Sequence, residues 1–423
     1  MSQMPPISTT STSTAIALIG SLDTKGEDFA FVKAEIERRG LAALVIDTSV
    51  MDEPAFTPNV SAAEVAEAGG SSLAALRKAG DRGAAIGVMA KGAAAILKRL
   101  HGEGQVQGVL GMGGSAGATI ATTAMRGLPV GVPKVMVSTL AGGNVATYVG
   151  DSDIVMMPSI VDVAGVNSIS ARIYTNAAAA VCGMATATPT EIPTKPLIAA
   201  SMFGNTTQLV GKCKAKLEAA GYEVLVFHAT GAGGRMMEKL ISEGHFVGVL
   251  DVTTTEWADE LVGGTLSAGP TRLDAAAQAG IPQVIAPGCL DMVNFGPLES
   301  VPDKFGPSAG SGQSDRLFYV WNPTVTLMRT TPEENAALGL ILAEKANAAT
   351  GPVAFFLPAN GVSILDSPGG LFWWPEADLA LFDAIQLNAR PDIAVEVVDA
   401  NINDDAFANA VTTKLLHFLT GEE

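Results

Sequence analysis

The stretch that decides the fold is Val109-Leu-Gly-Met-Gly-Gly-Ser-Ala-Gly-Ala-Thr119, an apolar run that changes into glycines and then into an alanine-rich segment. This pattern predicts a buried strand over 107–112 and a helix over 116–126, joined by a turn at Gly113, Gly114 and Ser115. Such a turn directs backbone N–H groups and the positive end of a helix dipole at one point. Glycine also lets an anion approach without meeting a Cβ atom. We therefore expect the turn to bind a phosphate or a carboxylate.

The alternative is a plain strand-to-helix turn packed on a sheet. No lysine follows the last glycine, as it does in phosphate-binding loops of the Gly-Lys-Ser/Thr kind, and the spacing is not that of dinucleotide-binding loops. The expectation of anion binding therefore depends on backbone geometry, to which Gly117 and the hydroxyl groups of Ser115 and Thr119 contribute.

Length and composition indicate a multidomain α/β protein. A chain of 423 residues is too long for one ordinary core, and 48% hydrophobic residues with 46 glycines favour helices packed closely on sheets. The net charge of −17 argues against a nucleic-acid partner. No apolar run reaches the roughly 18 residues of a membrane span. Three scattered cysteines fit the cytoplasm, and the Ser/Thr/Pro-rich residues 1–14 are expected to form a disordered tail rather than a secretory signal.

The first half of the chain predicts one doubly wound domain. Strand 15–20, helix 27–39 and strand 41–47 form a βαβ unit, with the loop 21–26 between the first two. The further expected elements are helices at 61–68, 71–79, 81–100 and 167–187 and strands at 133–138 and 154–157. Residues 187–196 contain three prolines and no apolar period, so they are predicted to be a linker.

The second half repeats the first. Strand 197–203, helix 206–220 and strand 223–228 restate the βαβ unit, and 246–251 matches 107–111. The later expected elements are strands at 282–286 and 353–357, helices at 255–261, 272–279, 331–350, 377–388 and 404–420, and a long loop or lid at 288–313. We therefore predict two doubly wound, Rossmann-like parallel-sheet domains, 15–190 and 191–423, with ligands at the carboxyl ends of the strands or between the domains.

Polar residues that follow the first strand are candidates for the same ligand. Asp23, Thr24 and Lys25 are expected near the glycine turn, where Lys25 could meet phosphate and Asp23 a metal or a ribose hydroxyl. The alternative is that Asp23 or Thr24 is an ordinary helix cap.

The second domain offers candidates for a substrate pocket and for catalysis. Gly233, Gly234 and Arg235 lie in a glycine-rich turn that we interpret as the counterpart of the first, and Arg235 and Arg272 suit a carboxylate or a phosphate. Asp251 and Glu256 follow a strand, where two carboxylates could perform acid–base chemistry or hold Mg²⁺. Cys289 follows another strand and is a candidate nucleophile. The alternatives are an ordinary loop arginine, capping acids and a core cysteine. The four histidines are too dispersed for a zinc site.

Four ordered motifs together resemble a known family. They are Ser21-Leu-Asp-Thr-Lys-Gly-Glu27, Gly111-Met-Gly-Gly-Ser-Ala-Gly117, His228-Ala-Thr-Gly-Ala-Gly-Gly-Arg235 and Thr326-Leu-Met-Arg-Thr-Thr331. They resemble the ATP-binding domain family of the tomato mosaic virus resistance protein. In the plant protein of this family, a TIM-barrel-like domain follows the ATP-binding domain. The resemblance implies two Rossmann-like halves, a nucleotide at Gly113, Gly114, Ser115 and Gly117 beside Asp23 and Lys25, and a homodimer. Trp321 and Trp374 stand where the family pattern has histidine and aspartate, which puts in question any chemistry that those polar residues perform.

Three hypotheses follow. The first is a cytoplasmic, ATP-binding enzyme that acts on a small acidic metabolite. Carboxylates would hold the Mg²⁺ that accompanies ATP, and we expect no permanently bound metal. The second is a non-catalytic, nucleotide-responsive module that acts through a protein partner such as a separately encoded TIM-barrel enzyme. The third is a hydrolase or lyase that uses the acids of the second domain without a nucleotide.

Overall fold

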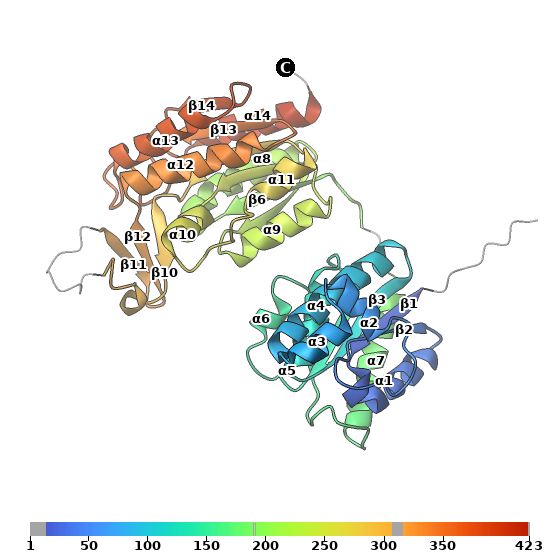
Figure 1. Ribbon diagram of the computed structural model, residues 1–423. Coiled ribbons are helices and arrows are strands. Elements are labelled where there is room, and N and C mark those ends of the chain that lie inside the picture. The colour runs from blue at the N-terminus through green and yellow to red at the C-terminus, as the bar shows by residue number, and fades with distance from the viewer. Residues whose placement is uncertain (1–13, 189, 191, 307–315, 422–423) are drawn as a thin grey trace, which may run out of the picture. The chain divides into compact units, whose positions relative to one another are not determined.

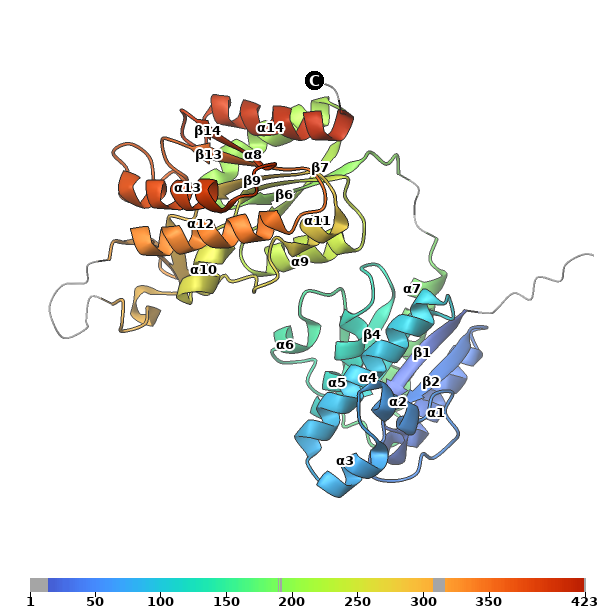
Figure 2. The same ribbon diagram turned by 45° about the horizontal axis from the view of Figure 1, so that its top comes forward.

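The computed structural model describes residues 14–188, 190, 192–306 and 316–421, and it divides the chain into two compact units, Met1–Glu191 and Ile192–Glu423. Of the predicted tail, all but Thr14 lies outside the described residues. Each unit is an α/β domain around a parallel sheet, which confirms the predicted fold class (Figures 1 and 2). Among the described residues, no helix combines the length and the apolar character that a membrane crossing requires.

The N-terminal domain contains a five-stranded parallel sheet in the order β2-β1-β3-β4-β5. Its strands are β1 (Ala15–Gly20), β2 (Ala42–Asp47), β3 (Val106–Gly113), β4 (Lys134–Ser138) and β5 (Val155–Pro158). Its helices are α1 (Leu22–Glu37), α2 (Ala62–Ala68), α3 (Leu73–Ala79), α4 (Arg82–Gly102), α5 (Ser115–Arg126), α6 (Ala146–Val149) and α7 (Ser170–Thr186). The winding reverses between β1 and β3, and ligands of doubly wound sheets bind at such a reversal.

Alternation along the central strands explains why both faces of this sheet are covered. Ala17 and Ile19 of β1 pack into a core with α2, α4 and α5, whereas Ile16 and Leu18 pack with α1 and α7. Because successive strand residues point to opposite faces, a fully apolar strand such as β1 needs helices on both sides.

The C-terminal domain has a six-stranded parallel sheet in the order β14-β13-β9-β8-β6-β7. Its strands are β6 (Leu197–Met202), β7 (Glu223–His228), β8 (Gly248–Thr253), β9 (Gln283–Gly288), β13 (Val353–Pro358) and β14 (Ala394–Val398). Its helices are α8 (Thr207–Ala219), α9 (Ala232–Ser242), α10 (Glu256–Val262), α11 (Asp274–Ala279), α12 (Pro332–Asn347), α13 (Pro375–Asn388) and α14 (Asp405–Thr420), with short 3-10 turns at η1 (Gly204–Thr206) and η2 (Leu298–Ser300). Its first four strands are arranged like those of the N-terminal sheet, so the predicted repeat extends to topology.

Helices cover both faces of this sheet as well. Apolar residues of α8 and α14 form one core with Ile198, Ala200 and Leu250, as Figure 1 shows for the two helices. On the other face α9 and α11 pack against Ala199 and Val249. Helices α10, α12 and α13 form a further core with Ile285 of β9 and Phe355 of β13.

A small antiparallel sheet in the order β10-β12-β11 is absent from the sequence prediction. Its strands are β10 (Met292–Phe295), β11 (Phe318–Asn322) and β12 (Val325–Arg329). The prediction of a loop or lid over 288–313 was therefore wrong where β10 lies. Residues 307–313 of that segment lie outside the described residues. The strand was missed because it is short and contains Asn294, whose side-chain amide is buried against Asp259.

One boundary and two further elements differ from the prediction. Helix α1 begins at Leu22 rather than at 27, so Asp23, Thr24 and Lys25 belong to its first turn, and Lys25 interrupts the helix with φ −131°. Helix α9 was not predicted, and it begins inside the glycine-rich turn, at Ala232. Strand β14 was not predicted, because it is an edge strand with two exposed residues and no continuous apolar run.

The packing of α2 on α4 yields a stability test. A Cβ on Gly92 would lie 1.8 Å from the carbonyl oxygen of Val65, whereas one on Gly87 of the same helix would meet nothing within 4 Å. We expect Gly92→Ala to lower the free energy of unfolding by about 1–3 kcal/mol, because α2 must move away. Gly87→Ala should raise it by about 0.5–1 kcal/mol through helix propensity. Urea unfolding of both variants measures this, and equal effects would contradict the packing.

Candidate functional site

The glycine turn lies at the reversal of winding in the N-terminal sheet, at the carboxyl end of β3. Gly113 has φ +149°, and a Cβ there would lie 3.2 Å from the Cα of Gly117. A Cβ on Gly117 would in turn lie 3.1 Å from the carbonyl oxygen of Met112. These two glycines are therefore required for the close approach of α5 to the end of β3.

Helix α5 starts at this turn without a side-chain cap. Gly114 occupies the N-cap position and has no side chain to accept a hydrogen bond from the first turn. The first N–H groups of a helix have no partner within the helix, so those of Ser115, Ala116 and Gly117 can be donated to a ligand. Ser115 is exposed. Thr119 is one turn further along, and its hydroxyl donates to the carbonyl oxygen of Ser115 at 2.9 Å, so it is directed into the helix.

The first turn of α1 lies at the neighbouring strand end and is fixed by Asp47 of β2. The buried Asp47 carboxylate accepts hydrogen bonds from the N–H groups of Leu22 and Ser49, at 3.1 and 2.9 Å. The N–H of Asp23 is bound by the hydroxyl of Ser49. One carboxylate oxygen of Asp23, Oδ1, is buried without a hydrogen-bond partner among the described residues. Thr24 is exposed.

Lys25 brings a positive charge to the same place. A Cβ on Gly113 would lie 3.8 Å from the Cε of Lys25, and the ammonium group donates to the carbonyl oxygen of Val163. The structure therefore brings Lys25 to the glycine turn, whereas the carboxylate of Asp23, two residues earlier in α1, accepts a hydrogen bond from the N–H of Asp52 beyond β2. Uncapped amides beside an ammonium suit a phosphate.

In the C-terminal domain, three of the candidate residues, Asp251, Glu256 and Arg272, form a buried ion cluster with Glu238. Arg272 binds Asp251 through both terminal nitrogens, at 2.5 and 2.6 Å, and Glu256 through Nε at 2.7 Å. A third carboxylate, Glu238, lies 3.1 Å from the guanidinium. Burial alone would lower the pKa of Arg272, but the adjacent Asp251 raises it well above its usual value, and burial raises the pKa of Glu238.

Glu256 also occupies the start of α9. Its Oε1 accepts hydrogen bonds from the N–H groups of Gly231 and Gly234, at 2.7 and 3.1 Å. A Cβ on Gly234 would lie 2.2 Å from Glu256, and one on Gly233 would lie 1.9 Å from a backbone oxygen of His228. These glycines therefore serve packing around a carboxylate that the chain itself supplies.

Topology corrects the proposed equivalence of the two glycine-rich turns. The turn at 230–235 follows β7, the second strand of its domain, whereas the turn at Gly113 follows the third strand, β3. The positional counterpart of the latter is the end of β8, where Thr253, Thr254 and Glu256 are buried. The repeated stretches 107–111 and 246–251 indicate this correspondence.

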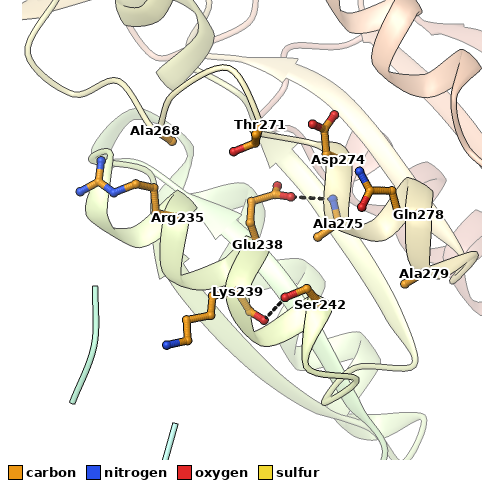
Figure 3. A pocket seen from close by; sticks show the side chains of 10 residues that line it. All are labelled: Arg235, Glu238, Lys239, Ser242, Ala268, Thr271, Asp274, Ala275, Gln278 and Ala279. Atoms are coloured by element: carbon orange, nitrogen blue, oxygen red, sulfur yellow. Dashed lines mark hydrogen bonds between the residues drawn. The ribbon is translucent and has the colours of Figure 1, made fainter. Parts of the chain in front are cut away.

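Arg235 lines a hollow of about 570 Å³ between α9 and α11, together with Glu238 of the ion cluster. Its guanidinium donates to the carbonyl oxygen of Ser267 at 3.1 Å. Figure 3 shows Lys239 one turn along the same helix and Glu238 directed at the N–H of Ala275 across the hollow. The polar lining includes both signs of charge.

Cys289 adopts φ +59° directly after β9 and is fully buried. Burial, and then the nearby Asp291, raise the pKa of its thiol well above its usual value. A thiolate nucleophile requires the opposite environment, with a lowered pKa and access for the substrate.

A second buried ion cluster was missed by the sequence analysis. Arg329 of β12 binds Asp378 of α13 at 2.8 Å and lies 3.5 Å from Asp366. Asp366 is joined to Asp291 through Ser363, whose hydroxyl donates to Asp291 and accepts from the N–H of Asp366. Burial and then Asp366 raise the pKa of Asp291 to about 7 and that of Asp378 to about 8. The residues are too far apart in sequence for any spacing rule to group them.

Comparison with known proteins yields matches over both domains. Residues 14–190 match the N-terminal domain, and residues 195–419 the C-terminal domain, of the "Uncharacterised protein family (UPF0261)". A UPF0261 protein of Clostridium tetani is 51% identical over 406 residues, which are 96% of this chain and 98% of that protein. One of Rhizobium meliloti is 44% identical over 93% of this chain and 96% of that protein.

A tomato protein is similar as well. The ToMV resistance protein Tm-1(GCR237) of Solanum lycopersicum is 37% identical over 96% of this chain, which corresponds to 56% of the tomato protein's length.

The cluster around Arg272 gives a second stability test. In Arg272→Met, three carboxylates stay buried without their cation, so we expect the free energy of unfolding to fall by about 3–5 kcal/mol at neutral pH. Asp251→Asn should lower the free energy of unfolding by less, because Glu256 and Glu238 continue to balance the charge of Arg272. Chemical denaturation of both variants measures the difference. A loss below 1 kcal/mol in Arg272→Met would contradict the assigned network.

The raised pKa of Asp378 gives a pH test. A carboxyl whose pKa is higher in the folded than in the unfolded state contributes stability below pH 4, and this contribution is lost as the pH rises through about 8. Asp378→Asn cannot ionise. We therefore expect the free energy of unfolding of the wild type to fall, relative to the variant, by at least about 1 kcal/mol between pH 5 and 8. Parallel stability curves for the two proteins would refute this.

Proposed function

Because the chain belongs to the UPF0261 family, whose two domain models it matches in order, we propose one function for it as a member: its N-terminal domain binds ATP. The triphosphate lies against the glycine turn at 113–117, and the protein acts in the cytoplasm. The observation that carries the proposal is the uncapped start of α5, beside Lys25, at the reversal of winding.

Each group has a defined part in this proposal. The N–H groups of Ser115, Ala116 and Gly117 donate to phosphate oxygens, and the helix dipole favours the negative charge. Lys25 lies close enough to leave Val163 and pair with a phosphate. The unpartnered Oδ1 of Asp23 is a suitable oxygen ligand for the Mg²⁺ that accompanies ATP.

An enzyme that acts on a small acidic metabolite would need a pocket for that substrate. The hollow beside Arg235 and Lys239 is the feature that favours such an enzyme. The burial of Asp251, Glu256, Arg272 and Cys289 favours the other candidate, a non-catalytic module that responds to the nucleotide. In that case the module acts through a homodimer or through a protein partner such as a TIM-barrel enzyme. Turnover of ATP that a metabolite stimulates supports the enzyme, and its absence across a panel of small acids supports the module.

Calorimetry with ATP tests the proposed binding site. In Gly114→Asp the new carboxylate lies at the start of α5 and repels the phosphates, so we expect the affinity to fall about 100-fold or more. In Gly114→Asn the new side chain has the same size as aspartate but no charge, so the affinity for ATP should fall about tenfold at most. If the Asp variant binds ATP as tightly as the Asn variant does, the phosphates do not lie at this turn.

A further inference from the structure

Three residues other than glycine have a left-handed backbone in the described part of the chain: Ile160 (φ 66°), Leu273 (φ 75°) and Cys289 (φ 59°). This conformation is unfavourable for any residue with a Cβ, and most of all for a β-branched one. Leu273 and Cys289 are 2% and 0% exposed, so the packing of their side chains offsets the strain. Ile160 is 71% exposed and has no such compensation in its own domain.

Hydrogen bonds on both sides impose this conformation on Ile160. The N–H of Val161 donates to the carbonyl oxygen of Ser159 at 2.7 Å, which makes Ile160 the centre of a γ-turn. The hydroxyl of Ser159 donates to the carbonyl oxygen of Val161 at 2.6 Å, and its N–H is held by Ser138 at the end of β4. Further along, Gly165 is bound to Asp28. The turn is therefore built to present its central side chain outward.

The turn lies on the edge of the sheet that carries the glycine turn. Ile160 follows the carboxyl end of β5, and β4 separates β5 from β3. Neighbouring strands lie about 4.8 Å apart, so the two turns are separated by about 10 Å along the sheet edge. Thr139 lies between them, since a Cβ on Gly114 would meet its hydroxyl at 3.8 Å. A nucleotide whose phosphates lie at the glycine turn can span this interval with its ribose and base.

We propose that Ile160 is a specificity-determining residue of the nucleotide site and that its side chain packs against the face of the purine base. This inference rests on the proposed function. Binding of the base supplies the apolar contact that the N-terminal domain itself does not give to Ile160, and the strained turn fixes the position of the side chain before the ligand binds.

The test compares ATP with inorganic tripolyphosphate on Ile160→Gly in the full-length protein. Glycine removes the side chain and accepts the left-handed backbone without strain. We expect the affinity for ATP to fall about 5- to 20-fold, because the apolar contact is lost, while the affinity for tripolyphosphate stays within twofold. The melting temperature without ligand should stay the same or rise by a few degrees. Ile192→Gly is the matched control, since Ile192 is 73% exposed and belongs to the predicted linker at 187–196, and it should leave both affinities unchanged.

The outcomes separate the two proposals. If the wild type does not bind ATP, the proposed function fails and this inference fails with it. If the wild type binds ATP and Ile160→Gly binds it equally well, only this inference is overturned. An equal loss for ATP and tripolyphosphate also overturns it, because the turn then acts on the phosphates. A melting temperature several degrees below that of the wild type means that Ile160 packs against protein, and this result overturns it too.

Discussion

The first N–H groups of a helix need acceptors from outside the helix, and the two domains meet this requirement in different ways. At the start of α9, Glu256 accepts hydrogen bonds from two glycine N–H groups, and Arg272 balances its charge. At the start of α5 the N-cap is Gly114, which has no side chain to offer. The C-terminal domain thus supplies an anion of its own to the start of α9, whereas the N-terminal domain leaves the N–H groups at the start of α5 to solvent or to a ligand.

The two halves of one repeated topology therefore differ in how their buried and exposed polar groups are arranged. Buried carboxylates around Arg272 and Arg329 stabilise the C-terminal domain only while their cations stay in place, and burial keeps them away from substrates. In the N-terminal domain the corresponding edge keeps an exposed serine, an unpartnered carboxylate oxygen and a strained, exposed isoleucine. The C-terminal domain also has an unpartnered carboxylate oxygen at Asp291 and a strained residue at Cys289, but both residues are fully buried there.

Much of the fold could be predicted from the sequence, because apolar runs such as 15–20 and 107–112 specify strands buried on both faces. The glycine turn could be located because it joins such a strand to a helix. The antiparallel sheet was missed because β10 contains a buried asparagine and β11 is half exposed. The pairing of Arg272 with Asp251 and of Arg329 with Asp378 was out of reach, since each pair joins residues at least 21 positions apart. The strain at Ile160 leaves no mark in the sequence, as no glycine or asparagine stands there.

The most direct measurement of the central claim is an NMR titration of the backbone amides with ATP. The account predicts that the signals of Ser115, Ala116 and Gly117 shift as ATP is added, because their N–H groups gain phosphate acceptors, while those of Gly231 and Gly234 stay in place against Glu256. Unchanged signals at the start of α5, or shifts confined to the start of α9, would contradict it.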